Sequence, residues 1–230
     1  MCVTKIGVKS FFDEHDIHKY FVRARVPKFL LYLTKDNCPD ISDYPNLKAH
    51  LENFKKIMLN RRETKKGLNK WFHLHWPRVD SYFENPKIVL PAMFDKPIAA
   101  FQRDSGYFGL SSNVVCRKTK KYELKFLLAI LNSCFAAYWF YKYGKRRGVG
   151  VDIGVGKLRE FPIKKTAPEK QIEFINIVDK ILAITKDADY LANSIKQAQV
   201  KKYEKQIDQM VFELYGMYDE DIRIVEGEGK

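Results

Sequence analysis

Residues 87–163 constrain the fold of this chain more than any other part of the sequence. Three β-rich segments come first, at residues 87–91 (KIVLP), 97–102 (PIAAFQ) and 107–117 (YFGLSSNVVCR). An apolar stretch with helical character follows over residues 122–143, and Gly144 is placed to end that helix. Short strands next to a long apolar helix are typical of an α+β fold, in which the helix covers one face of the strands.

Two details refine this expectation. Asp104-Ser105-Gly106 separates the second β-rich segment from the third and predicts a hairpin turn between them. Residues 145–156 are basic and glycine-rich, which indicates a loop, and residues 157–163 then predict a last strand.

The segments before residue 87 are weaker in pattern. Residues 28–35 (KFLLYLTK) predict a strand, and the alternation in residues 71–76 (WFHLHW) predicts another. Between them, residues 44–62 predict one helix, with Pro45 in its first turn and apolar residues recurring at helical spacing. We expect residues 1–40 to be a connector with a first strand.

A different pattern begins at Pro168. Thr166 and Glu169 have the spacing of a capping box, and an apolar stripe then continues to a stop at Gly216, with a break near Lys186. This predicts one long helix or a helical hairpin. Its apolar stripe suits either its own domain or a partner helix. The expected division is therefore 1–40, a β-rich domain with packed helices at 41–165, and a helical region at 166–230.

The chain is strongly basic, and its charge points to a class of partner. It has 41 Lys and Arg against 28 Asp and Glu, a formal net charge of +13 and a sequence pI of about 9.4. A charge of this size opposes compaction unless a polyanion is the usual partner. Nucleic acid is the first candidate and an anionic membrane surface the second, with a merely solvated basic surface as the remaining alternative.

Cysteine usage and hydropathy favour a cytoplasmic protein. The four cysteines form no CxxC pair, which argues against a zinc site or a disulfide framework and favours buried thiols in a reducing compartment. The most apolar run, residues 126–140, is shorter than the roughly 20 residues that span a bilayer. No secretory signal is visible, and we expect the run to be a buried core helix.

Enzyme signatures are missing from the sequence. The Asn-Pro pair at Asn85 continues with Lys-Ile, whereas adenine methyltransferases need an Asn/Asp-Pro-Pro-aromatic tetrad to hold a flipped base. The glycine-rich loop before Lys157 has neither P-loop nor GxGxxG spacing. His73 and His75 alternate but lack a third metal ligand nearby. We therefore expect no catalytic, cofactor-binding or metal-binding residues.

Basic clusters interleaved with aromatic residues are the positive features. Cations can neutralise phosphates, while Arg, Asn and Ser can read base edges. The candidate phosphate contacts are Arg61, Arg62, Lys145, Arg146, Arg147 and Lys157. The candidate base readers are Arg103, Ser111 and Asn113. The glycines of residues 148–156 would let the backbone approach a phosphate or a base. The three tryptophans, Trp71, Trp76 and Trp139, are expected in the core rather than as stacking platforms.

At this point the sequence resembles a family. The segments PKIVLP (86–91) and LLAILNS (127–133), the basic Arg146-Arg147-Gly148 and the ending Phe161-Pro162-Ile163 are similar to the TaqI-like C-terminal specificity domain. This is the target-recognition part of type II adenine-N6 DNA methyltransferases and of fused restriction–methylation enzymes. The end of the chain, around Leu214-Tyr215-Gly216, also resembles the specificity subunits of type I systems.

The resemblance implies a recognition module without catalysis of its own. Family enzymes carry the S-adenosylmethionine site and the tetrad in a preceding domain, so that no cofactor is expected in this chain, which we interpret as a fragment. The implied partners are double-stranded DNA and a methyltransferase catalytic domain, in cis or in trans, in a prokaryotic cytoplasm. Family members recognise different sequences, so base readers are not transferable. The alternative is an assembly subunit that docks a catalytic subunit through its C-terminal helices.

Overall fold

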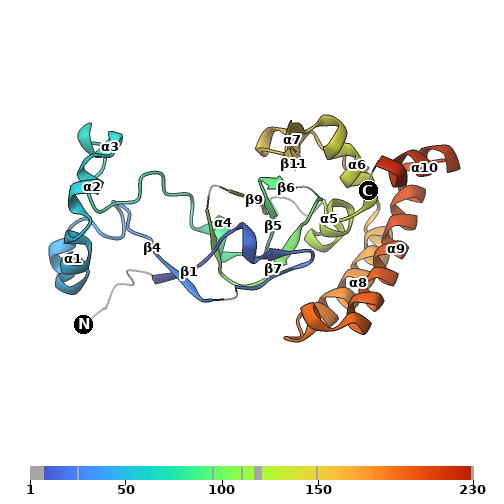
Figure 1. Cartoon of the computed structure of the whole chain (residues 1–230), viewed down its shortest axis with the longest axis horizontal. Coiled ribbons are helices and arrows are strands. Elements are labelled where there is room, and N and C mark those ends of the chain that lie inside the picture. The colour runs from blue at the N-terminus through green and yellow to red at the C-terminus, as the bar shows by residue number, and fades with distance from the viewer. Residues whose placement is uncertain are drawn as a thin grey trace. The chain divides into compact units, whose positions relative to one another are not determined.

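The computed structural model describes residues 8–24, 26–94, 96–109, 111–116, 121–148 and 150–228 (Figure 1). Their contacts form two compact units. The smaller unit takes the described residues up to Phe11 together with Pro27–Ser81, and the larger takes Phe12–Val26 together with the described residues from Tyr82 onward. The α+β class is confirmed. The three-part division expected from the sequence stays a prediction.

The larger unit is built on strand β5 (Lys87–Pro91), which is buried along its whole length. Strands β7 (Ala100–Gln102) and β9 (Ser112–Cys116) pair with it antiparallel, one on each edge. The hairpin predicted around Asp104 is wrong, because both neighbouring segments pair with the central strand instead of with each other. In the sequence, strand β8 (Tyr107–Phe108) lies between β7 and β9. The all-apolar centre of β5 explains the order, since it suits a strand covered on both faces.

Lys87 is the exception to the apolar character of β5. Its side chain is fully buried, and its ammonium group donates to the carbonyl oxygens of Phe83 (2.6 Å), Asn85 (3.1 Å) and Asp104 (3.1 Å). Each acceptor compensates for part of the hydration that the charge loses on burial. The lysine thereby ties the end of helix α4 (Ser81–Glu84) to the turn that precedes β8.

The N-terminal segment of the larger unit is packed against this sheet. It contains a single turn η1 (Glu14–Asp16) and the short strands β2 (Ile17–His18) and β3 (Phe21–Val22), which pair antiparallel. Tyr20 between them is buried in a left-handed conformation, with φ of 78°. Its backbone N–H donates to Ala99 O at 2.9 Å, and its carbonyl accepts from Phe101 N at 3.0 Å.

The apolar stretch expected as one helix forms two, α5 (Leu124–Leu131) and α6 (Cys134–Tyr143), bent by 67°. The cause is Asn132-Ser133. The Asn132 amide bonds both backbone groups of Ala99, with Oδ1 accepting from N and Nδ2 donating to O, each at 2.8 Å. Ser133 Oγ accepts from Ala136 N and so caps α6. Gly144 ends α6, as predicted.

Helix α5 is mostly buried, and α6 buries Phe135, Ala136 and Phe140, which agrees with the predicted core role. In the described parts of the chain, no single helix is long and apolar enough to cross a membrane, although the bent pair α5–α6 meets both criteria when taken together.

The C-terminal region is a helical hairpin made of α8 (Pro168–Thr185), a turn η3 (Tyr190–Ala192) and α9 (Ser194–Tyr215), followed by α10 (Asp219–Glu228). The break after α8 and the stop at Gly216, with φ of +70°, are confirmed. The hairpin packs on the larger unit's own core through Phe174, Val178, Ile181, Val200, Ile207 and Val211. Part of the predicted stripe stays outside this core, because Ile172, Leu191 and Ile195 are exposed.

The capping box predicted at Thr166 is wrong. Helix α8 begins after Ala167 with no side-chain cap, and the Thr166 hydroxyl donates to Lys164 O at 2.9 Å. Gln171 takes over the anchoring role: its amide accepts from Glu123 N and donates to the carbonyls of Lys121 and Thr166, each at 3.0 Å. A long-range contact therefore fixes the start of this helix.

The smaller unit has its own core, formed by Leu33, Cys38, Ile41, Leu51 and Phe72. Strands β1 (Val8–Phe12) and β4 (Lys28–Leu31) pair antiparallel, so the predicted strand at 28–35 is shorter than expected. A turn η2 (Ile41–Asp43) leads to α1 (Pro45–Glu52), which starts at Pro45 as predicted.

Two predictions for this unit are wrong. The helix expected over 44–62 is broken into α1, α2 (Lys55–Leu59) and α3 (Arg62–Lys65), because α2 buries no side chain fully and only Met58 of it packs against the core. Residues 71–76 form no strand. Phe72 and His73 are both buried although they are adjacent, and His73 Nε2 contacts Cys38 O at 2.9 Å.

Asn132→Ala should destabilise the larger unit by about 2–4 kcal/mol, because it leaves the buried N–H and C=O of Ala99 without their partner. Urea denaturation measures the change in the free energy of unfolding. Asn176→Ala is the matched control, since Asn176 is exposed on α8 and its replacement should change stability by less than about 0.5 kcal/mol. Equal effects for the two variants would contradict the role of Asn132.

Candidate nucleic-acid interface

A second small sheet carries the most basic segment of the larger unit. Strand β6 (Met93–Phe94) follows β5 after one residue, and β11 (Gly150–Asp152) pairs with it antiparallel. Strand β10 (Lys145–Arg147) pairs with β11 as its outer neighbour, and all three of its side chains are exposed. The segment predicted as a loop over 145–156 therefore contains both strands of a β-hairpin, with Gly148 (φ +60°) in its turn.

The hairpin is anchored in the hydrophobic core. Val151 and Ile153 are buried on either side of Asp152, and Ile153 N donates to Ala92 O at 3.0 Å. Gly144 lies against this anchor: a Cβ added there would be 2.3 Å from Val151 Cγ1 and 2.5 Å from Phe140 O. The glycine at position 144 is thus required by close packing, and it lets α6 run directly into β10.

The cations of β10 point to two faces, since successive side chains alternate along a strand. Lys145 and Arg147 share a face with Asp152, which lies opposite Lys145 in the register. Arg147 Nε lies 3.1 Å from Asp152 Oδ2. Arg146 is on the other face, and its guanidinium carbon lies 4.0 Å from the centre of the Tyr141 ring.

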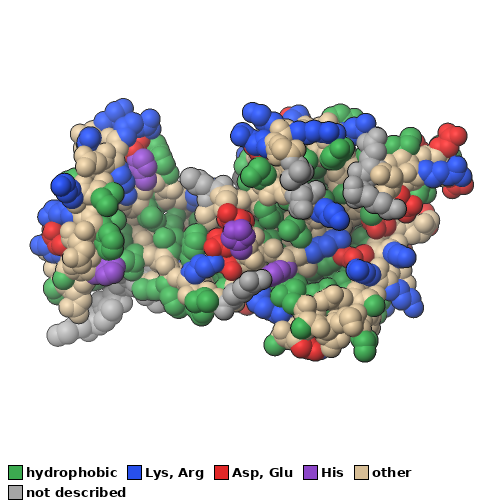
Figure 2. All heavy atoms as spheres, viewed as in Figure 1, with side chains coloured by type: hydrophobic (Ala, Val, Ile, Leu, Met, Phe, Trp, Pro, Cys, Tyr) green, Lys and Arg blue, Asp and Glu red, His purple; other side chains and the backbone are tan. Residues whose placement is uncertain are grey.

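Helix α7 (Val155–Glu160) follows the hairpin, where the sequence predicted a strand over 157–163. That prediction is wrong, because Leu158 and Phe161 pack on the core at the i, i+3 spacing of a helical turn. Lys157 pairs with Glu160 at 2.6 Å, and Arg159 is exposed. Figure 2 shows Lys and Arg side chains gathered over the part of the surface formed by α7 and β11.

Ser111 lies next to the base of the hairpin. Its carbonyl accepts from Ala92 N at 2.7 Å, and Ala92 O accepts from Ile153 N, so one residue links both segments. The Ser111 hydroxyl donates to Glu14 Oε2 at 2.5 Å, and this hydrogen bond lowers the pKa of Glu14. The structure therefore ties the backbone of Ser111 to the base of the hairpin, while its hydroxyl is bonded to Glu14.

Asn113 is near this group but faces inward. It is 6% exposed and pairs with Leu90 across the sheet. Its Nδ2 atom and the Ser112 hydroxyl are buried and have no hydrogen-bond partner within the described part of the chain.

Arg103 is exposed at the other end of the sheet. It follows Gln102, which pairs with Lys87, whereas Ser112 pairs with Pro91. Four residue steps along β5 separate these two positions, or about 13 Å at the usual rise of a strand. Arg103 and Ser111 therefore do not converge on one point.

Arg61 and Arg62 belong to the smaller unit, and both have internal partners. Arg61 donates from Nε to Met58 O at 3.2 Å and from Nη2 to Trp71 O. Arg62 Nη2 lies 2.6 Å from Oε1 of the buried Glu63, which also contacts His75. No group of three metal-ligating side chains occurs among the residues that the structure describes.

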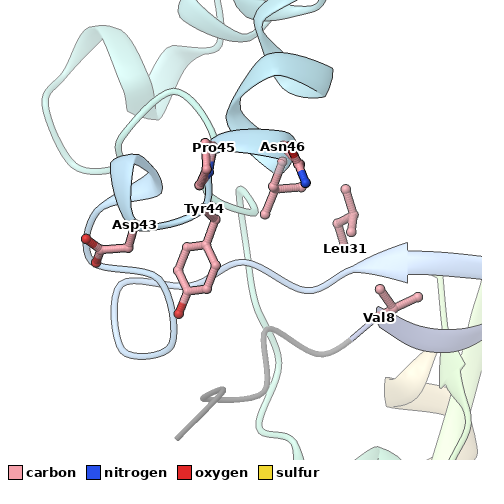
Figure 3. Close-up of a pocket in the computed structure, with 7 residues that line it drawn as sticks. Val8, Leu31, Asp43, Tyr44, Pro45 and Asn46 are labelled. Carbon is pink, nitrogen blue, oxygen red and sulfur yellow. The ribbon is translucent and has the colours of Figure 1, made fainter. Parts of the chain in front are cut away.

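The tryptophans divide between two environments. Trp71 and Trp139 pack against the two hydrophobic cores, as predicted. Trp76 is 68% exposed, so its predicted core position is wrong. A pocket in the smaller unit is lined by Val8, Leu31, Asp43, Tyr44, Pro45, Asn46 and Leu47 (Figure 3). This lining contains no cation, so the pocket adds nothing to the basic surface.

Sequence reasoning missed Asp152 and Tyr141, which hold two of the three cations of β10. The signal was present in the segment KRRGVGVD. If Gly148 is placed in a tight turn, strand alternation brings Asp152 opposite Lys145. An interpretation of these glycines as places where the backbone approaches a ligand does not predict the hairpin.

Comparisons with known proteins identify the class. This fold, with its cationic hairpin, is that of a specificity domain. Residues 11–163 match the TaqI-like C-terminal specificity domain, and the chain belongs to this family. The resemblance seen in the sequence is confirmed. The type II methyltransferase M.MjaIV of Methanocaldococcus jannaschii is 28% identical over 217 residues, which cover 86% of this chain and 68% of that protein.

The fold is also shared with a solved structure. The type IIL restriction–modification enzyme MmeI, determined in complex with DNA, matches 94% of this chain with a TM-score of 0.66 and 11% sequence identity. The chain spans 29% of the MmeI chain.

Gly144→Ala should destabilise the protein by about 1–3 kcal/mol, because a methyl group there overlaps Val151 and the Phe140 carbonyl. Gly156→Ala is the matched control. No atom lies within 4 Å of its added Cβ, and alanine favours the helix by up to about 1 kcal/mol. Thermal unfolding of both variants measures the difference, and a neutral Gly144→Ala would contradict the packing described.

Proposed function

We propose that this chain recognises a specific sequence in double-stranded DNA on behalf of a methyltransferase catalytic domain. The observation that carries the proposal is the cationic β10–β11 hairpin, built on the core of a domain that belongs to the specificity-domain family. The named relatives support it, since one is described as a type II methyltransferase and the other was solved bound to DNA.

The candidate residues divide by chemistry. Lys145, Arg146, Arg147 and Lys157, with Arg61 and Arg62 of the smaller unit, would mostly neutralise phosphates. Ser111, Asn113 and Arg103 would read base edges. Ser111 is the best placed of these three, since it is exposed beside the hairpin, whereas Asn113 would first have to turn outward.

Catalysis is assigned to another domain, in cis or in trans. That domain would bind S-adenosylmethionine and methylate adenine N6, while this chain by itself is no enzyme. Its place would be the cytoplasm of a prokaryotic cell. An assembly role for the C-terminal hairpin has less support, because much of the apolar surface that would bind a partner helix already packs on the chain's own core, although Ile172, Leu191 and Ile195 are exposed.

For the 230-residue chain and duplex DNA, the logarithm of the association constant should fall linearly with the logarithm of the salt concentration, because each neutralised phosphate releases counterions. Lys145→Ala should weaken binding to all sequences alike and reduce the slope by about 0.9. Fluorescence anisotropy across salt concentrations measures both quantities. Lys201→Ala, an exposed lysine on α9, is the control and should leave the slope unchanged. A wild-type affinity that does not depend on salt would refute the proposal.

A further inference from the structure

Asp152 is an unexpected residue in the middle of a surface that favours phosphate. It lies on β11, with Lys145 directly opposite and Arg147 bonded to it. A carboxylate at this place repels the DNA backbone and lowers the attraction that the two cations provide. A hairpin that only gripped phosphates would be stronger without it, so its presence favours a different task.

The carboxylate of Asp152 is held at both oxygens. Oδ2 lies 3.1 Å from Arg147 Nε, and Oδ1 accepts from Gly154 N at 3.1 Å. The strand beneath it is fixed as well, because Val151 and Ile153 are buried. Asp152 is therefore a rigid support whose position is set by the core of the larger unit.

This support orients the guanidinium of Arg147. The contact to Asp152 is made by Nε, so the end of the planar group that is formed by Nη1 and Nη2 is directed away from the carboxylate. Two parallel N–H donors in that arrangement match the O6 and N7 acceptors that guanine presents in the major groove. The Arg147 side chain is 55% exposed, so this edge is accessible to a ligand.

We propose that Arg147, held by Asp152, reads one guanine of the recognition sequence in the major groove. The inference rests on the proposed function and changes one role within it: Arg147 becomes a specificity-determining residue and Asp152 its positioning residue. Lys145, on the same face, keeps its phosphate role. The Asp152 carboxylate favours base reading by Arg147 over a phosphate contact, since it weakens the attraction of Arg147 to a phosphate and leaves a contact to the neutral base edge intact.

The test begins with selection of bound sequences from a random duplex library by the 230-residue chain. The wild type should select a motif with at least one position restricted to guanine. Arg147→Ala removes the paired donors, so it should reduce discrimination at that one position by roughly 5- to 150-fold. Asp152→Asn should relax the same position and strengthen binding to non-specific DNA, because it removes a negative charge.

A base analogue separates base reading from indirect effects. Replacing the selected guanine with 7-deazaguanine removes the N7 acceptor and should weaken wild-type binding, whereas Arg147→Ala should be nearly insensitive to the same replacement. Lys145→Ala is the matched control on the same face, and it should weaken all sites alike while keeping every position of the motif.

The outcomes distinguish the two levels of the proposal. A wild-type chain that binds duplex DNA without any sequence preference would overturn the proposed function and this inference with it. A wild-type motif that Arg147→Ala leaves unchanged, with all sites weakened equally, would overturn only the role of Arg147 and make it a phosphate contact. Relaxation at a position other than guanine would likewise overturn the assignment.

Discussion

Strand β5 is the element on which the rest of the larger unit depends. Its backbone is paired on both edges, by β7 and β9, and the side chains from Lys87 to Leu90 are fully buried. Burying a lysine in such a strand would be costly without acceptors, and three backbone carbonyls provide them. Because those carbonyls belong to the segment before β5 and to the turn after β7, the charge holds these two segments in one arrangement. The hairpin with the basic surface continues from this strand through β6.

Local sequence patterns correctly predicted the helices and strands that are determined by residues close together in the sequence. The apolar KIVLP became a buried strand, and the long stripe after Pro168 became two helices that end where Lys186 and Gly216 indicated. In these segments the residues that set the structure are near neighbours, so periodicity and terminal residues are sufficient.

The predictions were wrong where the structure of a segment depends on a contact with residues far away in the sequence. The bend at Asn132 depends on its bonds to Ala99, which is 33 residues away, and the start of α8 depends on Gln171 reaching Lys121. Strand order is of the same kind, since nothing in the turn at Asp104 indicates that both flanking segments prefer β5. Sequence reading located the segments and missed their pairing, because pairing is set by burial across the whole sheet.

In the candidate site, too, the sequence predicted the residues but not their contacts. Its cations were found from composition alone, because exposed Lys and Arg are visible in any basic segment. Their partners were not. Arg61 donates to backbone carbonyls, Arg146 stacks on Tyr141 and Arg147 contacts Asp152, and none of these contacts follows from charge. Where the residues point is thus a property of the fold, and the roles assigned to individual residues stay predictions.

The net charge of +13 and the placement of Asp152 serve opposite needs of a protein that must find one sequence among many. Cations raise affinity for every phosphate backbone, so each one added strengthens wrong sites as much as the right one. Specificity is a difference of affinities, and it increases when a cation binds poorly wherever its proper acceptors are missing. An arginine next to a fixed carboxylate has this property, because its attraction to phosphate is reduced while its paired donors remain available to a base edge. The exposed hairpin allows such pairs to change without disturbing Val151 and Ile153, and a single scaffold can therefore present different recognition residues on the same core.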